Sequence, residues 1–369
     1  MMWKIYQPVP VIFGAGKRQL IGDILQEKGF QRAFLLCGNS MIRTGNADFL
    51  EKAAGGRIIG RSSDIESDPT LQNIDDNAAL VRKAGADCII AMGGGSIMDC
   101  AKSVAVAVAE GCSGEDLMQG HVITKALPLI LLPSTAGSGS EVTSAAGITD
   151  KIRQKKGGIM SPLLYATTAI VDPELTYSVP YKTAAHAGLD ALAHALDVLL
   201  SQRLQPYSEA LALRSASLVL ENIEAAVTQS DTTARDQMAA ASNLAGLALS
   251  QIGTSGSHAC ADTLALHYHL PHGEACAFTL AEWVRVSRSV RPELDRMARQ
   301  LGLADAAALA GRIDELKETF GLHTRLSQLG GTAADIPSLV TESLASRSMQ
   351  AAVAQLSREE MTAFYQRLL

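Results

Sequence analysis

Four side chains in this sequence are of the types that bind a divalent metal ion. Asp190 and His194 stand four residues apart in an alanine- and leucine-rich run without proline, so a helix would project both from one face, one turn apart. His258 and His272 follow later in the chain. One carboxylate oxygen and three imidazole nitrogens suit Fe²⁺ or Zn²⁺ and leave room for a substrate oxygen. A single Asp–His pair at this spacing is more often a hydrogen bond on a helix surface, so the pattern needs support from the rest of the chain.

Two loops rich in small residues precede these side chains. Gly93-Gly94-Gly95-Ser96 lies between an apolar run and a helical pattern, where glycines let a phosphate approach and a helix N-terminus attracts it. Met98 stands where a G-x-G-x-x-G motif has its third glycine, so the tetrapeptide alone fits a tight turn equally well. Residues 133–141, Pro-Ser-Thr-Ala-Gly-Ser-Gly-Ser-Glu, follow another apolar run, and their hydroxyls suit a ribose or a nicotinamide. Loops at strand ends are where open α/β sheets bind ligands.

Short apolar runs alternate with helical patterns in the first half of the chain. The runs predict strands at residues 11–13, 32–37, 57–60, 87–92 and 127–132, and the patterns predict helices that reach about residue 28 and span 73–84 and 97–109. This alternation favours a mostly parallel sheet that is covered on both faces.

From Tyr181 onward the pattern changes to long alanine- and leucine-rich segments. They predict helices at residues 182–201, 206–229, 232–250, 257–269, 274–290, 292–301, 304–320 and 353–369. We therefore place a boundary near Val179-Pro180. The expected organisation is an α/β dinucleotide-binding domain at residues 1–179 and an all-α metal- and substrate-binding domain at residues 180–369.

The composition is that of a globular protein of two domains. The 369 residues are 47% hydrophobic and 19% charged, and the net charge of −6 disfavours a nucleic acid as the main partner. The six cysteines form no C-x-x-C pair, which fits a reducing compartment. We find neither a signal-peptide core nor an apolar segment of the roughly 18 residues that a membrane span needs. The sequence therefore predicts a cytoplasmic protein without a membrane or nucleic-acid partner.

Five motifs occur along the chain in a definite order. They are Gly93-Gly94-Gly95-Ser96 with Asp99 and Lys102; residues 134–143 (Ser-Thr-Ala-Gly-Ser-Gly-Ser-Glu-Val-Thr); Ile170-Val171-Asp172-Pro173; residues 188–194 (Gly-Leu-Asp-Ala-Leu-Ala-His); and Pro271-His272-Gly273. Each motif alone is unspecific, but the ordered set resembles the iron-containing (group III) alcohol dehydrogenases over residues from about 10 to 285.

This resemblance implies a fold, an activity and a ligand set. The fold would be dehydroquinate synthase-like, an α/β N-terminal dinucleotide-binding domain followed by an all-helical C-terminal domain. The activity would be NAD(P)-linked interconversion of a small primary alcohol and its aldehyde, in which the metal polarises the substrate oxygen. The metal would be Fe²⁺, with Zn²⁺ as the other ion that accepts these ligands, and the chain would form a homodimer. The implied metal ligands are Asp190, His194, His258 and His272.

Further positions match those that hold the nucleotide in the family. NAD-preferring relatives tend to carry Asp at the position of Gly38, where a carboxylate would repel the 2′-phosphate of NADP. Glycine would not repel it and Arg43 would attract it, so NADP(H) is favoured, with NAD(H) as the alternative. The implied cofactor contacts are Gly38, Asn39, Gly94, Gly95, Ser96, Asp99, Ser134, Thr135, Ser138, Thr143 and Lys156.

The sequence does not indicate which residue would act as a catalytic acid. Asp262 stands where relatives often have a histidine near the nicotinamide, and His267 lies nearby; both are weak candidates, and either His267 or His269 is expected only to end a helix. The segments at residues 269–280 and 356–360 look most like members that reduce phosphonoacetaldehyde or related small anionic aldehydes. Arg153 and Lys155 would suit a substrate anion, but solvated positions fit them better.

Three alternatives remain at this point. A dehydroquinate-synthase-like lyase would share the architecture but would be expected to have a Glu/His/His ligand set, against which the Asp190–His194 pair speaks. A metal-independent reductase of the maleylacetate type would use the histidines only to position its substrate. A non-catalytic nucleotide-sensing or metal-storing protein would keep the fold alone.

Overall fold

The computed structural model describes residues 3–369, and the chain divides into two compact units. One unit is Tyr6–Val179; the other is Pro180–Leu369 together with residues 3–5. The named strands all belong to the first unit and the second is helical, so the α/β-plus-helical fold class expected from the sequence is confirmed. Among residues 3–369, no helix combines the length and apolar character needed to cross a lipid bilayer.

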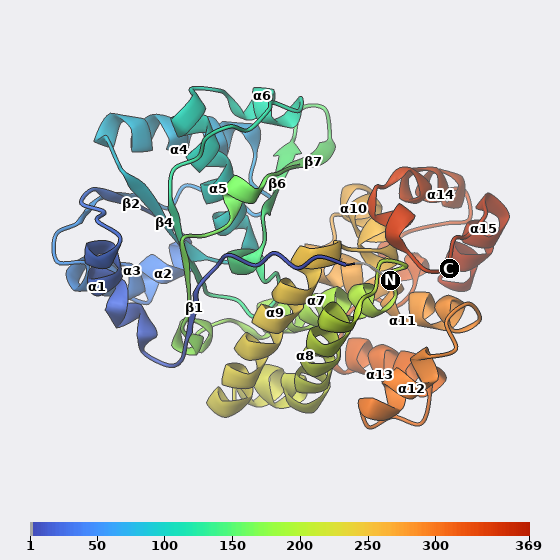
Figure 1. Ribbon diagram of the computed structural model, residues 1–369. Helices are drawn as coiled ribbons and strands as arrows, with labels where there is room; N and C mark the ends of the chain where they lie inside the picture. The colour runs from blue at the N-terminus through green and yellow to red at the C-terminus, as the bar shows by residue number, and fades with distance from the viewer. Residues whose placement is uncertain (1–2) are drawn as a thin grey trace. The chain divides into compact units, whose positions relative to one another are not determined.

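The α/β unit is built on a six-stranded parallel sheet (Figure 1). Its strands, in the spatial order β1-β8-β5-β4-β2-β3, are β1 (Val11–Phe13), β8 (Thr168–Val171), β5 (Leu129–Pro133), β4 (Cys88–Gly93), β2 (Ala33–Cys37) and β3 (Ile58–Ser62). The helices are α1 (Ile21–Glu27), α2 (Asn39–Arg43), α3 (Asn46–Ala53), α4 (Leu71–Ala84), α5 (Gly95–Glu110) and α6 (Gly114–Met118).

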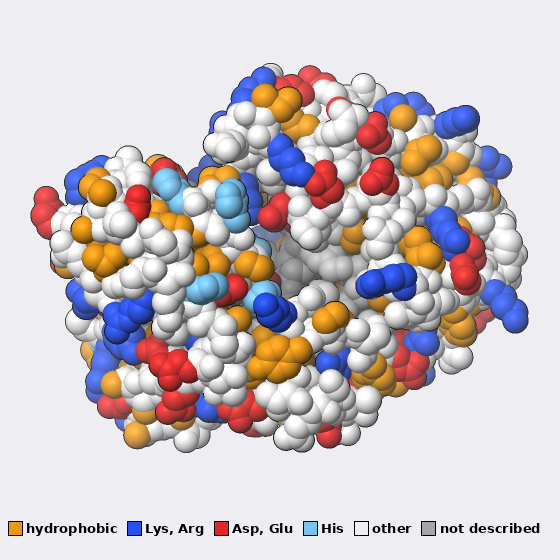
Figure 2. Space-filling view, turned by 180° about the vertical axis from the view of Figure 1, so that it is seen from behind, with side chains coloured by type: hydrophobic (Ala, Val, Ile, Leu, Met, Phe, Trp, Pro, Cys, Tyr) orange, Lys and Arg blue, Asp and Glu red, His pale blue; other side chains and the backbone are white. Residues whose placement is uncertain are grey.

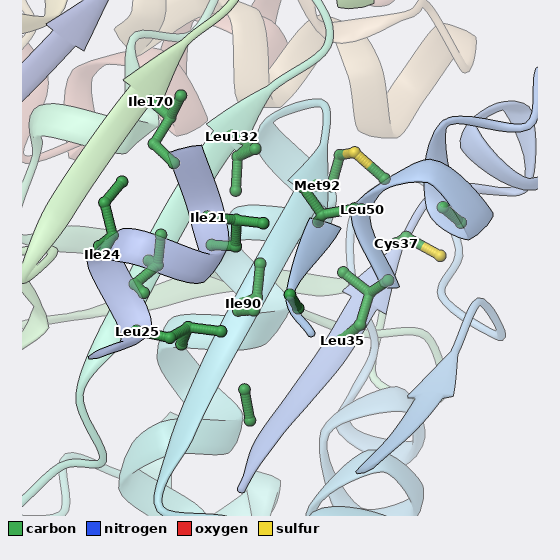
Figure 3. Packing of buried hydrophobic residues seen from close by; sticks show 14 of the residues in the cluster. Ile21, Ile24, Leu25, Leu35, Cys37, Leu50, Ile90, Met92, Leu132 and Ile170 are labelled. Carbon is green, nitrogen blue, oxygen red and sulfur yellow. The ribbon is translucent and has the colours of Figure 1, made fainter. Parts of the chain in front are cut away.

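Both faces of this sheet are buried. On one face, Ile21 and Leu25 of α1 belong to the same packed cluster as Ile90 of β4 and Leu132 of β5 (Figure 3). The residues that alternate with Ile90 and Leu132 point to the opposite face and are buried as well. A parallel sheet with helices on both sides produces this burial, which explains why its strands read as continuous apolar runs.

The strand order reverses between β2 and β4. From β2 the chain goes on to β3 on one side, whereas from β4 it goes on to β5 on the other. Because the six strands are parallel, the loops that begin at Gly38 and Gly94 leave the same edge of the sheet at neighbouring positions. Open α/β sheets bind their ligands at such a reversal.

A two-stranded antiparallel hairpin is absent from the elements that the sequence predicts. It pairs β6 (Ala145–Asp150) with β7 (Lys155–Met160). The sequence gives no strand signal here because Lys-Lys-Gly-Gly at residues 155–158 interrupts any apolar alternation. Strand β8 is likewise absent from the predicted elements.

The helical unit contains nine named α-helices. They are α7 (Tyr181–Leu199), α8 (Pro206–Glu224), α9 (Thr232–Ile252), α10 (Gly256–Tyr268), α11 (His272–Arg288), α12 (Leu294–Gln300), α13 (Ala306–Thr319), α14 (Ile336–Ala345) and α15 (Arg358–Arg367). The single helix predicted at residues 353–369 is wrong in its start. The Ser357 hydroxyl caps α15 by accepting from the Glu360 N–H, and the Glu360 carboxylate accepts from the Ser357 N–H, so the helix begins only there.

Two glycines allow α7, α10 and α11 to approach one another closely. An ideal Cβ on Gly273 of α11 would lie 2.2 Å from the carbonyl oxygen of His186 and 3.1 Å from Cβ of Asp190, both on α7. A Cβ on Gly256 of α10 would lie 2.4 Å from the indole ring of Trp283 on α11. These contacts hold together the three helices that carry the metal-ligand candidates.

Gly273→Ala tests this packing. We expect the added methyl group to force α11 away from α7, lowering the free energy of unfolding by about 1–3 kcal/mol and weakening divalent-metal binding. Gly311→Ala is the control, since it lies within α13 and its added Cβ would have no neighbour within 4 Å. Thermal unfolding and metal titration of both variants measure the difference; equal behaviour of the two would contradict the close-approach argument.

Candidate metal centre and nucleotide-binding edge

One carboxylate oxygen lies at similar distances from three imidazole nitrogens in the helical unit. Oδ1 of Asp190 is 3.7 Å from Nδ1 of His194, 3.8 Å from Nε2 of His258 and 3.9 Å from Nε2 of His272. The structure thus gathers the four side chains that the sequence singled out as metal ligands. Asp190, His258 and His272 also form, with Cys276, a group whose ligand atoms all lie within 4.8 Å of one another.

The residues present fit a bound cation. Asp190 and His258 are only 6% and 7% exposed, and among residues 3–369 Oδ1 of Asp190 and Nε2 of His258 have no hydrogen-bond partner. Leaving such atoms buried and unpaired costs about 1–3 kcal/mol each, more when the group is charged. A shared divalent cation would satisfy the lone pairs of both atoms.

The three histidines differ in their pKa shifts. Burial favours a neutral ring at His194, whereas the charges of Cys276 and nearby carboxylates outweigh burial and raise the pKa of His258 and of His272. Burial lowers the pKa of His194 to about 4, although Asp190 opposes this shift. The ring of His194 stacks on that of His258 with centroids 4.4 Å apart. Burial raises the pKa of Asp190, but the charges of the neighbouring histidines lower it by more. The net shift is downward, and the group is a carboxylate.

Asp197, which the sequence analysis did not select, orients His258. It is fully buried on α7, and its Oδ2 lies 2.8 Å from Nδ1 of His258. Because a carboxylate only accepts, Nδ1 carries the proton and Nε2 is left facing Asp190. The same carboxylate accepts from the backbone N–H groups of Ser255 and Ser257 at the start of α10. The available signal was its position seven residues after Asp190, on the same helix face.

A second carboxylate supports the start of α11. Oε1 of Glu274 accepts from the backbone N–H of His323 and lies 2.7 Å from its Nδ1, while Oε2 lies 3.3 Å from Nε2 of His186. Burial raises the pKa of Glu274, but the hydrogen bonds from His186 and His323 outweigh it and lower the pKa to about 2. Glu274 therefore links α11 to α7 two residues beyond His272.

The metal-ligand candidates differ in exposure. The side chain of His272 is 41% exposed, whereas those of Asp190, His194 and His258 are nearly buried. Histidine side chains gather on one face of the helical unit (Figure 2). A substrate reaching the group would therefore approach along the side of His272.

The remaining polar candidates of this unit lie elsewhere on α10. Asp262 is exposed one turn after His258. Nε2 of His267 pairs with Glu342 at 2.9 Å. His269 is the left-handed residue that ends α10, which is the role expected for one of these two histidines.

The nucleotide-binding candidates of the α/β unit cluster at the carboxyl ends of β2, β4 and β5. A Cβ on Gly94 would lie 3.3 Å from Oγ1 of Thr135, and one on Gly95 would lie 3.0 Å from Oγ of Ser138, so the two small-residue loops pack directly together. Gly94 is the N-cap of α5 and offers no capping side chain. The first N–H groups of a helix begun in this way suit a phosphate.

Two of the implied cofactor residues hold the second loop in place. Asp99 accepts from the hydroxyl of Ser140 at 2.8 Å and from the Gly147 N–H at 2.9 Å. Nζ of buried Lys102 donates to Thr143 Oγ1, to both oxygens of Ser140 and to the Ala145 carbonyl. Asp99 and Thr143 thus position the loop that follows β5.

Two basic side chains of the hairpin, Arg153 and Lys156, are already paired. Lys156 lies 3.2 Å from Asp68, whose backbone N–H donates to Ser96 Oγ. Arg153 forms ion pairs with Glu115 and Asp150 at 2.8 Å. Arg43 is exposed on α2, and within residues 3–369 it forms no hydrogen bond or ion pair.

Comparison with known proteins identifies the family. A model described as iron-containing alcohol dehydrogenase matches residues 8–173, and one for the C-terminal part of the Fe-containing alcohol dehydrogenase family matches residues 184–369. The chain belongs to the iron-containing alcohol dehydrogenase family. The resemblance seen in the sequence motifs is therefore confirmed.

Several members of the iron-containing alcohol dehydrogenase family are similar over most of this chain. The structure of a sulfoacetaldehyde reductase from Bifidobacterium kashiwanohense in complex with NAD⁺ has a TM-score of 0.96 and 34% identity, covering 100% of this chain and 99% of that one. A sulfoacetaldehyde reductase of Bilophila wadsworthia is 29% identical over 93% of both chains. A 1-propanol dehydrogenase of Salmonella typhimurium is 35% identical over 72% of this chain and 70% of its own.

Asp197→Asn tests the support of His258. The amide has the same volume as the carboxylate, but its NH₂ group would face the N–H donors that Asp197 now accepts from. Without a carboxylate to accept its Nδ1 proton, His258 loses its fixed tautomer. We expect divalent-metal affinity to fall about 10- to 100-fold, measured by competition with a chelator. Ser257→Ala, which removes one hydroxyl bond to Asp197, is the control with a smaller effect. Unchanged affinity in Asp197→Asn would refute the assigned role.

Proposed function

We propose that this chain is a metal-dependent, NAD(P)-linked alcohol dehydrogenase that interconverts a small primary alcohol and its aldehyde. The main observation is that His194, His258 and His272 surround Oδ1 of Asp190, which has no hydrogen-bond partner in the described part of the chain. Family membership supports the same reaction class.

The chain's own residues bind and orient in this proposal. Asp190, His194, His258 and His272 hold the ion, with Fe²⁺ favoured by the family and Zn²⁺ compatible with the ligands. The chemistry that a bound metal and nicotinamide supply is Lewis acidity at the substrate oxygen and hydride transfer at its carbon. Asp197 keeps the proton on Nδ1 of His258, and the buried helices around Asp190 exclude water from the inner side of the group.

His272→Ala tests the proposed metal site with little risk to folding, because this ligand candidate is the exposed one. We expect aldehyde-dependent NAD(P)H oxidation by the iron-loaded, anaerobic protein to fall by about three orders of magnitude or more. Nucleotide affinity should change less than threefold, since the implied nucleotide contacts lie in the other unit. His267→Ala, an exposed histidine of the same unit paired with Glu342, serves as the control. Full activity of His272→Ala, or activity that survives exhaustive chelation, would refute metal dependence.

A small aldehyde with an anionic group is the second candidate substrate. Two of the similar proteins are sulfoacetaldehyde reductases, and the segment at residues 269–280 suggested an anionic aldehyde such as phosphonoacetaldehyde. The assay above therefore compares acetaldehyde and propionaldehyde with sulfoacetaldehyde and phosphonoacetaldehyde. A kcat/KM at least tenfold higher for an anionic member would favour this candidate, whereas the reverse order would favour an uncharged aldehyde.

NADP(H) is the proposed cofactor, with NAD(H) also accepted. At the N-cap of α2, Gly38 has no carboxylate to repel a 2′-phosphate, and the exposed Arg43 forms no ion pair among residues 3–369. The Bifidobacterium relative is described with NAD⁺, so both nucleotides belong in the test.

Gly38→Asp measures this preference directly. Gly38 has φ −73°, which any residue adopts, and an added Cβ would meet only Ser40 and Ile97 at 3.6 and 3.8 Å. We expect the new carboxylate to lower kcat/KM for NADPH at least tenfold while NADH use is kept or improved. Gly38→Asn, similar in size but uncharged, is the control. An unchanged NADPH-to-NADH ratio in Gly38→Asp would contradict the proposed preference.

A further inference from the structure

Cys276 lies one helical turn after His272 on α11, and the sequence analysis assigned it no role. Its side chain is buried, and its Sγ is 3.6 Å from Nε2 of His272. The ligand atoms of Asp190, His258, His272 and Cys276 all lie within 4.8 Å of one another. The sulfur is therefore part of the same compact group of potential ligands.

The separation of sulfur and nitrogen suits two ligands of one ion. Metal bonds of about 2.1 Å to nitrogen and about 2.3 Å to sulfur would place the two atoms about 3.1 Å apart at an angle of about 90° and about 3.8 Å apart at about 120°. The observed separation of 3.6 Å lies between these two values. A thiol that only donated a hydrogen bond to His272 would leave Asp190 Oδ1 and His258 Nε2 without partners, as they now are.

The two unpartnered atoms are an independent indication of a ligand at this place. They belong to side chains more than nine-tenths buried, and Nε2 of His258 lies 3.8 Å from Oδ1 of Asp190. Their lone pairs and the sulfur of Cys276 therefore face one small volume. A cation bound in this volume would satisfy the carboxylate, the imidazole nitrogens and the sulfur together.

We propose that Cys276 is a ligand of the divalent metal at this centre, bound through its sulfur as the thiolate; this inference rests on the metal site of the proposed function. On binding, the S–H bond breaks, a sulfur–metal bond forms and the proton passes to solvent. The thiolate and Asp190 together balance the two positive charges of the ion. A sulfur ligand also shifts the preference of the site toward zinc and cobalt, since thiolates favour softer ions than carboxylates do.

A cobalt titration tests this ligand without measuring activity. Metal-free wild type, Cys276→Ser and Cys260→Ser are titrated with Co²⁺ under anaerobic conditions. Cys260 is the matched control because it is a buried cysteine of α10 whose neighbours are Tyr365, Trp283, Ser343 and Thr279 rather than the metal-ligand candidates. We expect visible d–d bands in all three proteins. A near-ultraviolet sulfur-to-cobalt charge-transfer band should appear in wild type and Cys260→Ser and be lost in Cys276→Ser.

X-ray absorption of the zinc-loaded wild type gives a second measurement that needs no variant. A sulfur neighbour at about 2.3 Å supports the proposal, and a shell of nitrogen and oxygen alone overturns it. Stoichiometric Co²⁺ binding without a charge-transfer band likewise overturns the role of Cys276 while leaving the metal site intact. If wild type binds no stoichiometric Co²⁺ or Zn²⁺, the proposed function fails and this inference fails with it.

Discussion

The burial of two carboxylates on one face of α7 is the constraint on which the metal centre depends. Asp190 and Asp197 are seven residues apart, so their side chains project from the same side of the helix. Within residues 3–369, neither forms an ion pair with a lysine or an arginine. Asp197 is satisfied by backbone N–H groups, a hydroxyl and the imidazole of His258, whereas Oδ1 of Asp190 has no hydrogen-bond partner. Asp197 thus positions the other groups of the site, whereas Asp190 remains available to bind a metal ion.

This difference couples metal binding to the stability of the helical unit. An isolated buried charge is costly, and the cost is removed only when a cation or a set of donors reaches it. Asp197 also accepts from an N–H group at the start of α10. The same carboxylate therefore orients His258 and stabilises the start of the helix that carries it. Gly273 adds the close approach of α11 to α7. The site is therefore a product of helix packing, and a change in that packing moves several ligand candidates at once.

The sequence predicted the parts of this arrangement that depend on local periodicity. The helical placement of Asp190 and His194 follows from a four-residue spacing in an alanine-rich run, and the buried strands follow from their apolar runs. Asp197 and Cys276 have equally simple spacings in the sequence. Asp197 lies seven residues after Asp190, and Cys276 lies four residues after His272. Those spacings become informative only once α7, α10 and α11 are known to pack together. The β6–β7 hairpin escaped prediction because glycine and lysine hide its strand pattern.

The nucleotide-binding edge illustrates the difference between contacting a cofactor and shaping its site. The family motif implied that Asp99 and Thr143 touch the nucleotide, and the structure gives both of them bonds within the protein. Lys102 completes this network: burial lowers its pKa to about 8, while the charges of Asp99 and Glu141 oppose the shift. Its ammonium group has four oxygen acceptors at 2.7–3.1 Å, which compensate for its removal from water. A buried lysine held in this way fixes the loop after β5 against α5, so a motif residue can be essential to cofactor binding without reaching the cofactor.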